Sequence, residues 1–199
     1  MIKKKSGFTL VETLVVVFIS VLILGAILTV SMVSRWSLQT GSVLLDLQQE
    51  ASRGMDKMLE ELYIAGQSTV TIDNPDKEFV TFQAPTIYSE TETIYKADGT
   101  INWGDGTNTD YKIKYLVPSV GQTNAGRLIR RVLDGGDNTV SETILANAIE
   151  TISFTGYDTG ASIDYTQPNS LVISIAVSKT TLQGRSLRTE LSSQVTFRN

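Results

Sequence analysis

The sequence contains neither cysteine nor histidine among its 199 residues. Without cysteine the chain can form no disulfide, and it has no thiol nucleophile and no zinc–thiolate site. Without histidine it lacks the usual general base near neutral pH and the commonest metal ligand. Carboxylates, lysine, tyrosine and serine are still available for catalysis, but neither a G-x-S-x-G motif nor a Walker motif occurs. We therefore predict a protein that is not an enzyme.

The charge balance is mildly acidic, with 17 basic and 21 acidic residues and a net charge of −4. Proteins that coat nucleic acid usually carry a strong excess of positive charge, so a nucleic-acid partner is not expected. Apolar residues make up 41% of the chain, which is enough for a packed core and argues against wholesale disorder.

An uncharged apolar run extends from Leu14 to Val33. At about 1.5 Å per residue, a helix of this length spans about 30 Å, the thickness of a bilayer's hydrocarbon core. Three lysines, Lys3 to Lys5, precede the run, and Arg35 follows it. Because basic residues favour the cytoplasmic side, we expect a single-pass membrane protein with a cytoplasmic N-terminus and an exported C-terminal domain.

A cleaved secretory signal peptide is the first alternative, but its apolar region would be shorter and a small-residue cleavage site would follow it. Here Gly25 and Ala26 lie within the run, and more apolar residues come after them. An uncleaved signal anchor fits better, although it does not explain the acidic Glu12 beside the run. A carboxylate placed at depth in a bilayer costs about 2–3 kcal/mol on insertion scales.

Cleavage between Gly7 and Phe8 would explain Glu12. The new amine of Phe8 would be a positive charge one helical turn from Glu12, and in an assembly of parallel helices it could pair with the Glu12 of a neighbouring chain. Such pairing would set the register between subunits.

The stretch KKKSGFTLVE, Lys3 to Glu12, resembles the class III signal of type IV pilins and pseudopilins. Those signals have a short basic leader, a glycine before the cut, usually phenylalanine after it, and glutamate as the fifth residue of the mature chain. Gly7, Phe8 and Glu12 match all three positions. The resemblance implies cleavage by prepilin peptidase, N-methylation of Phe8, and assembly with other pilin or pseudopilin subunits from the inner or cell membrane into an extracytoplasmic filament.

A second helical pattern follows the membrane run. From Val43 onward, apolar residues recur in steps of three and four, the spacing of one helical face, at Leu44, Leu47, Ala51, Met55, Met58, Leu59 and Leu62. We predict a leader at 1–7 and one long helix at 8–66. Its membrane part covers about 8–34, and its domain-packing part about 43–65. Gly66 is the expected C-terminal stop.

The remaining residues, 67–199, show period-two patterns separated by turn signals such as Asp134-Gly-Gly-Asp-Asn. They predict strands at 79–83, 111–116, 127–133, 151–157, 170–178 and 190–197, with a short helix or turn near 142–148. The expected fold class is α+β, a pilin fold in which a long N-terminal transmembrane and amphipathic helix carries a C-terminal antiparallel β-sheet domain.

Several fragments beyond the signal are similar to minor pilins of the PilW type and to the J-type minor pseudopilin of type II secretion, among them 55–66, 128–131 and 195–199. The resemblance implies a minor structural subunit of a type IV pilus or a secretion pseudopilus. Two alternatives stay open: an unprocessed, single-pass anchored adhesive or binding protein, and an anchored hydrolase whose activity would reside in the part after about Gln67.

The loop from Asp98 to Asp110 is rich in the hard oxygen ligands that calcium prefers, with Asp105 between them. Its spacing departs from the EF-hand signature, so we expect a solvated loop of turn residues and no cofactor, with Asp98, Asp105 and Asp110 as the candidates if calcium binds. The same reading applies to Asp134, Asp137 and Asn138. Five arginines are expected to lie on charged strand faces and not to form a phosphate-binding patch: Arg127, Arg130, Arg131, Arg185 and Arg188.

Overall fold

The computed structural model describes residues 9–73, 76–86, 94–96, 98–159, 162–181 and 184–197. The chain forms two compact units, Met1–Ser42 and Val43–Asn199, and helix α1 (Leu10–Tyr63) contributes to both. The 3-10 helix η1 (Gln67–Thr69) follows α1. The strands are β1 (Thr71–Ile72), β2 (Phe79–Phe82), β3 (Ala84–Pro85), β4 (Trp103–Gly104), β5 (Lys112–Leu116), β6 (Leu128–Leu133), β7 (Thr139–Ala146), β8 (Ile149–Tyr157), β9 (Ser170–Thr180) and β10 (Ser186–Thr196).

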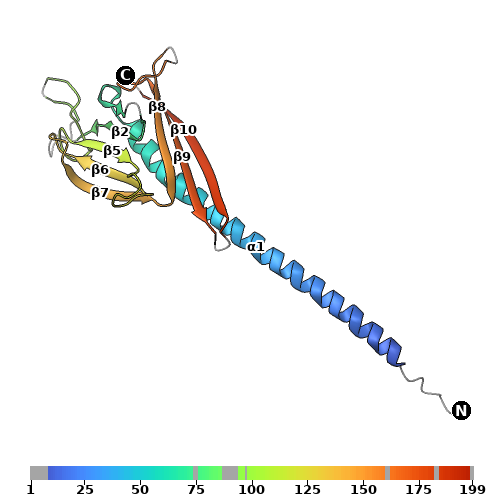
Figure 1. The fold of residues 1–199 in the computed structure, drawn as a ribbon. Helices are drawn as coiled ribbons and strands as arrows, with labels where there is room; N and C mark the ends of the chain where they lie inside the picture. Colours follow the sequence, from blue (N-terminus) through green and yellow to red (C-terminus); the bar gives the residue numbers. More distant parts are fainter. Residues whose placement is uncertain are drawn as a thin grey trace. The chain divides into compact units, whose positions relative to one another are not determined.

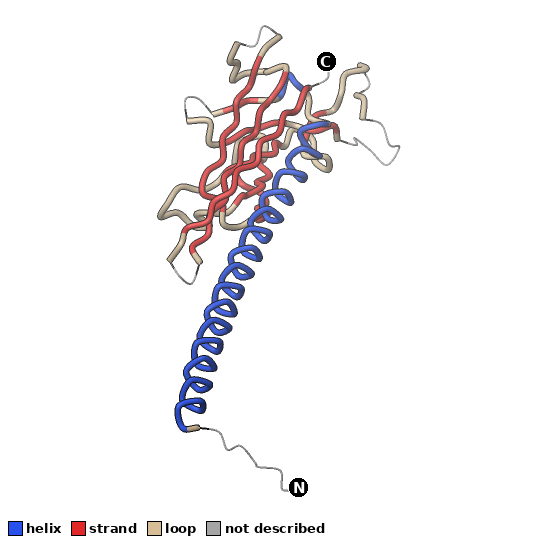
Figure 2. The backbone as a smooth tube through the Cα atoms, turned by 90° about the vertical axis from the view of Figure 1, so that its right-hand side faces the viewer, coloured by secondary structure: helices blue, strands red, loops and turns tan. Residues whose placement is uncertain are grey.

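The strands of the second unit form three antiparallel sheets (Figure 1). One sheet has the order β1-β2-β5-β6-β7, the second β10-β9-β8, and the third pairs β3 with β4. Figure 2 shows the strands gathered beside the C-terminal part of α1. These features confirm the expected α+β class, with a long N-terminal helix and an antiparallel sheet domain.

The C-terminal part of α1 supplies one wall of the core. Its buried residues recur at helical spacing, as the sequence pattern predicts: Leu47, Ala51, Gly54, Met55, Met58 and Leu62. They pack in one cluster with inward-facing strand residues such as Phe82, Tyr115 and Phe154. At Gly54, α1 packs closely against β6 and β7, because a Cβ there would lie 2.8 Å from Leu128 Cδ2 and 3.2 Å from Ala146 Cβ.

The end of α1 differs from the prediction in detail. The helix stops at Tyr63, and Gly66 is extended (φ −73°, ψ 122°), so it is not a left-handed helix cap. A side chain at this position would clash with Trp103, because a Cβ would lie 2.5 Å from its ring. Gly66 therefore accommodates a tryptophan from β4.

A short helix at 142–148 is absent, because residues up to Ala146 belong to β7; the turn lies at the end of this range, where Asn147 and Ala148 connect β7 to β8. This strand pairs with β6 as the last strand of its sheet, and its residues Thr139 to Ile144 are exposed whichever face they point to. An edge strand of this kind shows no alternation of apolar and polar residues. All six predicted strands are present, as β2, β5, β6, β8, β9 and β10. The strands β1, β3 and β4 have two residues each and are too short to produce a periodic signal.

Candidate functional site

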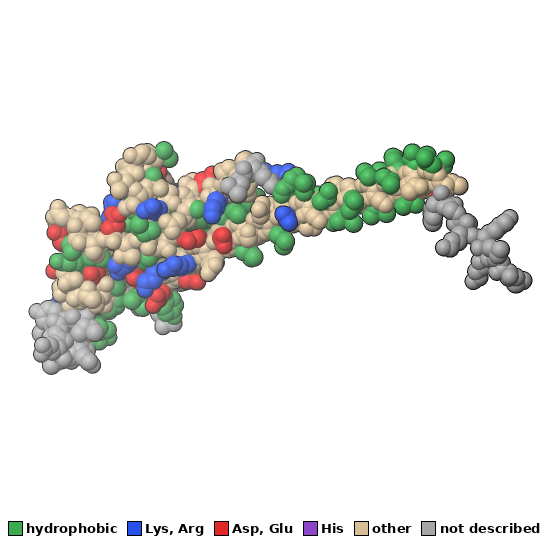
Figure 3. Space-filling view, turned by 90° about the horizontal axis from the view of Figure 1, so that it is seen from below, with side chains coloured by type: hydrophobic (Ala, Val, Ile, Leu, Met, Phe, Trp, Pro, Cys, Tyr) green, Lys and Arg blue, Asp and Glu red, His purple; other side chains and the backbone are tan. Residues whose placement is uncertain are grey.

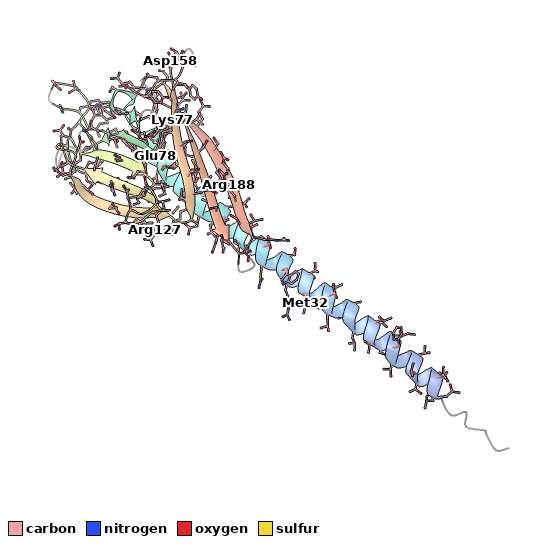
Figure 4. All side chains as sticks on the ribbon, viewed as in Figure 1. Met32, Lys77, Glu78, Arg127, Asp158 and Arg188 are labelled. Atoms are coloured by element: carbon pink, nitrogen blue, oxygen red, sulfur yellow. The ribbon has the colours of Figure 1, made fainter. Side chains whose placement is uncertain are left out.

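The N-terminal part of α1, from Leu10 to Ser42, is the candidate functional site. Between Leu10 and Val33 its large apolar side chains are about half or more exposed, from 47% at Val15 to 82% at Leu10. Figure 3 shows hydrophobic side chains covering this part of the helix, and Figure 4 shows Met32 projecting from it. Among the described residues, α1 is the one helix long and apolar enough to cross a membrane. The segment therefore needs lipid or other helices around it.

Three hydroxyl groups in the membrane part of this segment bond to carbonyl groups of the helix itself. Thr13 Oγ1 donates to the Thr9 carbonyl at 3.0 Å, Ser20 Oγ to the Val16 carbonyl at 2.8 Å, and Thr29 Oγ1 to the Gly25 carbonyl at 2.9 Å. An unpaired polar group in hydrocarbon costs several kcal/mol. Because these three donors are satisfied within the helix, they add no unpaired donor to the part of the segment that would enter a bilayer.

Glu12 lies in the first turn of α1, where its backbone N–H donates to Thr9 Oγ1 at 3.3 Å. A carboxylate at a helix N-terminus interacts favourably with the helix dipole. No cation of the described residues lies within ion-pairing distance of Glu12. The predicted cleavage and methylation residues, Gly7 and Phe8, lie outside the described residues.

The calcium candidates form local turns. Asp98 accepts hydrogen bonds from the Thr100 hydroxyl (2.6 Å) and backbone N–H (3.0 Å), which lower its pKa. Asp105 accepts bonds from the backbone N–H groups of Thr107 (2.8 Å) and Asn108 (2.6 Å). Burial raises the pKa of Asp105, but the hydrogen bonds outweigh burial and hold the pKa below its usual value. Asp110 lies in the left-handed region with φ 61°.

Asp134 also closes a local turn: its carboxylate accepts hydrogen bonds from the backbone N–H groups of Gly136 (2.9 Å) and Asn138 (2.8 Å). In the part of the chain that the structure describes, no three carboxylates converge on a position that could hold a metal ion.

Four of the five arginines bond to side chains of the domain. Arg127 Nη1 donates to Asn124, Arg131 Nε lies 2.8 Å from Glu142, and Arg188 Nε lies 3.3 Å from Glu150. Figure 4 labels Arg127, which lies just before β6, and Arg188, which lies on β10. Of the five arginines, Arg130, Arg131 and Arg188 lie on strands, and each pairs with a carboxylate of the chain.

A charged cluster that sequence reasoning missed joins α1 to the five-stranded sheet. Glu61 accepts bonds from Tyr115 Oη at 2.6 Å and from Arg130 Nε at 2.9 Å, and its side chain is only 13% exposed. Burial and the neighbouring Glu61 charge raise the pKa of Tyr115. Burial lowers the pKa of Arg130, but the bonds to Glu61 outweigh it and leave that pKa raised. The helical period places Glu61 among exposed residues, and no local signal indicates its strand partners.

Replacing Glu61 with glutamine should destabilise the sheet domain by about 2 kcal/mol, because the half-buried Arg130 guanidinium loses its counter-charge. The measurement is urea unfolding of the full chain in neutral detergent, followed by the fluorescence of Trp103, whose ring lies against Gly66. Glu60→Gln is the matched control, since Glu60 is 71% exposed and bonds only to Lys57. Equal midpoints for the two variants would contradict the role assigned to Glu61.

Two comparisons with known proteins bear on this segment. Residues 2–28 match the family model described as the prokaryotic N-terminal methylation motif. The match covers Gly7, Phe8, Glu12 and most of the apolar run. A search of curated proteins finds no match for the chain. The chain therefore carries a type IV pilin-like prepilin signal at the head of an apolar helix.

Proposed function

We propose that this chain is a minor pilin or pseudopilin, a structural subunit that prepilin peptidase cleaves between Gly7 and Phe8 and that enters a filament through α1. The observation that carries the proposal is the methylation motif at residues 2–28, which leads into an exposed apolar helix. Such a helix is suited both to wait in a bilayer and to pack among other helices.

The subunit waits in the membrane with its N-terminus in the cytoplasm and its sheet domain exported. The three lysines before the apolar run support this orientation. The minor type, similar to PilW-type pilins and the J-type pseudopilin, is supported by the lack of cysteine and by a compact unit that covers Val43–Asn199. Pilin-like subunits act by assembly, which agrees with a chain that lacks histidine and cysteine.

Intact-mass measurement of the chain from the membrane fraction tests the proposal. The expected result is a polypeptide that starts at Phe8 and carries one additional methyl group. Cells without the processing peptidase provide the control, and there the leader should stay attached. A chain that keeps Met1 to Gly7 while the peptidase is active would favour the unprocessed anchored adhesin or binding protein instead.

A further inference from the structure

The five-stranded sheet has a groove on the face directed away from α1. Inward-facing residues of its strands, such as Val80, Ile113 and Tyr115, belong to the core that includes α1. The alternate residues line a groove of about 480 Å³, which we call the basic groove. Its lining includes Lys112 and Lys114 of β5, Arg131 of β6, Phe79 and Thr81 of β2, and Asp137.

The strand register brings two cations together in the basic groove. Lys114 of β5 lies directly opposite Arg131 of β6 on one side and Thr81 of β2 on the other. Directly opposed side chains on neighbouring antiparallel strands have Cβ atoms about 5 Å apart, and like charges at this spacing destabilise a sheet. The groove therefore holds an unfavourable charge pair that the fold itself imposes.

Two of the three cations in the basic groove have a carboxylate partner, and the third does not. Lys112 Nζ lies 2.7 Å from Asp137 Oδ1, and Arg131 Nε lies 2.8 Å from Glu142 Oε2. For Lys114, no carboxylate of the described residues lies within ion-pairing distance, and its Nζ sits 3.4 Å from the centroid of the Phe79 ring.

The environment of Lys114 disfavours its positive charge. Burial is the largest cause that lowers the pKa of Lys114, and the charge of Arg131 is the next. The more distant Asp73 and Asp137 act in the opposite direction without restoring the usual value. A negatively charged group seated beside Lys114 would relieve both the desolvation and the repulsion.

We propose that the basic groove binds a single carboxylate side chain, glutamate or aspartate, presented by an extended segment of a partner protein, with the carboxylate between Lys114 and Arg131. Charge complementarity supports this occupant, because Lys114 has no carboxylate within ion-pairing distance among the described residues. In the described part of the chain, Arg131 uses only Nε to bond Glu142, so its terminal nitrogens are available as donors. Thr71, Thr81 and Gln83 border the same groove and offer hydrogen bonds to the peptide groups of such a segment.

The same contacts argue against nucleic acid. Asp137 and Glu142 flank the cations and would repel the closely spaced charges of a phosphate backbone. Bases bind single-stranded sites by stacking on aromatic rings, but the face of Phe79 is covered by the Lys114 ammonium group. The inference does not rest on the filament proposal, since it concerns only the sheet domain.

The test uses the full chain in neutral detergent and a capped, fluorine-labelled peptide, Gly-Ser-Glu-Ser-Gly. Its fluorine NMR signal should broaden saturably with added protein, and the matched peptide with glutamine should bind about tenfold more weakly. Lys114→Gln should weaken binding of the glutamate peptide about tenfold, whereas Lys114→Arg, which keeps the charge, should retain most of it. Lys179→Gln is the control for net charge, because Lys179 lies on β9 outside the basic groove, and it should change binding less than twofold.

A second measurement on the natural chain does not depend on the folding of a variant. The glutamate peptide should protect Lys114, and not Lys179, from an amine-reactive reagent, as read by mass spectrometry. Equal binding of the two peptides, equal effects of Lys114→Gln and Lys179→Gln, or no protection of Lys114 would overturn the inference. Displacement of the peptide by a lower concentration of inorganic phosphate would assign the groove to small oxyanions and would overturn it as well.

Discussion

A Glu12→Val chain is expected to insert into the membrane as well as the natural chain and yet to enter filaments at least about tenfold less often. Insertion should persist because the substitution makes the first turn of α1 more apolar. Incorporation should fall because the proposed partner of Glu12, the amine of Phe8 on a neighbouring subunit, would be left as an unpaired charge among packed helices. The measurement compares the amounts of the chain in the membrane fraction and in sheared, purified filaments.

Thr13→Val is the matched control for this experiment. Thr13 is the next residue of the same turn, and its hydroxyl already bonds to the Thr9 carbonyl of its own helix. Its loss should therefore leave incorporation unchanged. Normal filament content of Glu12→Val would show that pairing between subunits is not what requires a carboxylate at this position, while cleavage after Gly7 would remain a separate question.

A large loss of stability is expected for Gly156→Ala. Gly156 lies in β8 where the segment that leads to β9 crosses it, and the Asp164 N–H donates to its carbonyl at 2.9 Å. A Cβ at this position would overlap the Asp164 carbonyl oxygen and would lie 2.7 Å from both Ile72 Cδ1 and Pro168 Cβ. Because part of the obstruction is backbone, it cannot be relieved by a side-chain rotation.

Overpacking of this kind should cost about 3 kcal/mol of the free energy of unfolding, and the midpoint of thermal unfolding should fall by roughly 10 °C. Circular dichroism of the full chain in neutral detergent measures it. Gly135→Ala provides the comparison, since nothing lies within 4 Å of a Cβ at Gly135. A change at Gly156 as small as the one at Gly135 would mean that the segment around Asp164 packs less closely against β8 than described.

The sequence predicts the elements whose signals are periodic. Leu47, Ala51, Met55 and Met58 recur at helical spacing, and all four are buried against the sheets. Likewise, β2 and β5 alternate between partly and fully buried residues, as period-two patterns require. In both cases the spacing of apolar residues indicates which face of the helix or strand is buried, and the same face packs into the core.

The sequence fails where a residue's role depends on a distant partner. Glu61 has the helical position of a surface residue, yet its partners Tyr115 and Arg130 come from strands that follow it by 54 and 69 positions. The unfavourable pair of Lys114 and Arg131 likewise exists only because of the register between β5 and β6. Local propensity contains no information on such register, so neither the charged cluster nor the basic groove could be predicted.

The self-bonded hydroxyls of Ser20 and Thr29 have a mechanical consequence for a polymer built from such helices. With these two donors turned back onto their own helix, contacts between neighbouring helices along this part of the run would be mainly dispersion contacts between apolar side chains. The proposed ion pair of Glu12 with the Phe8 amine of a neighbouring chain would then be the main directional contact that opposes sliding of one helix along another.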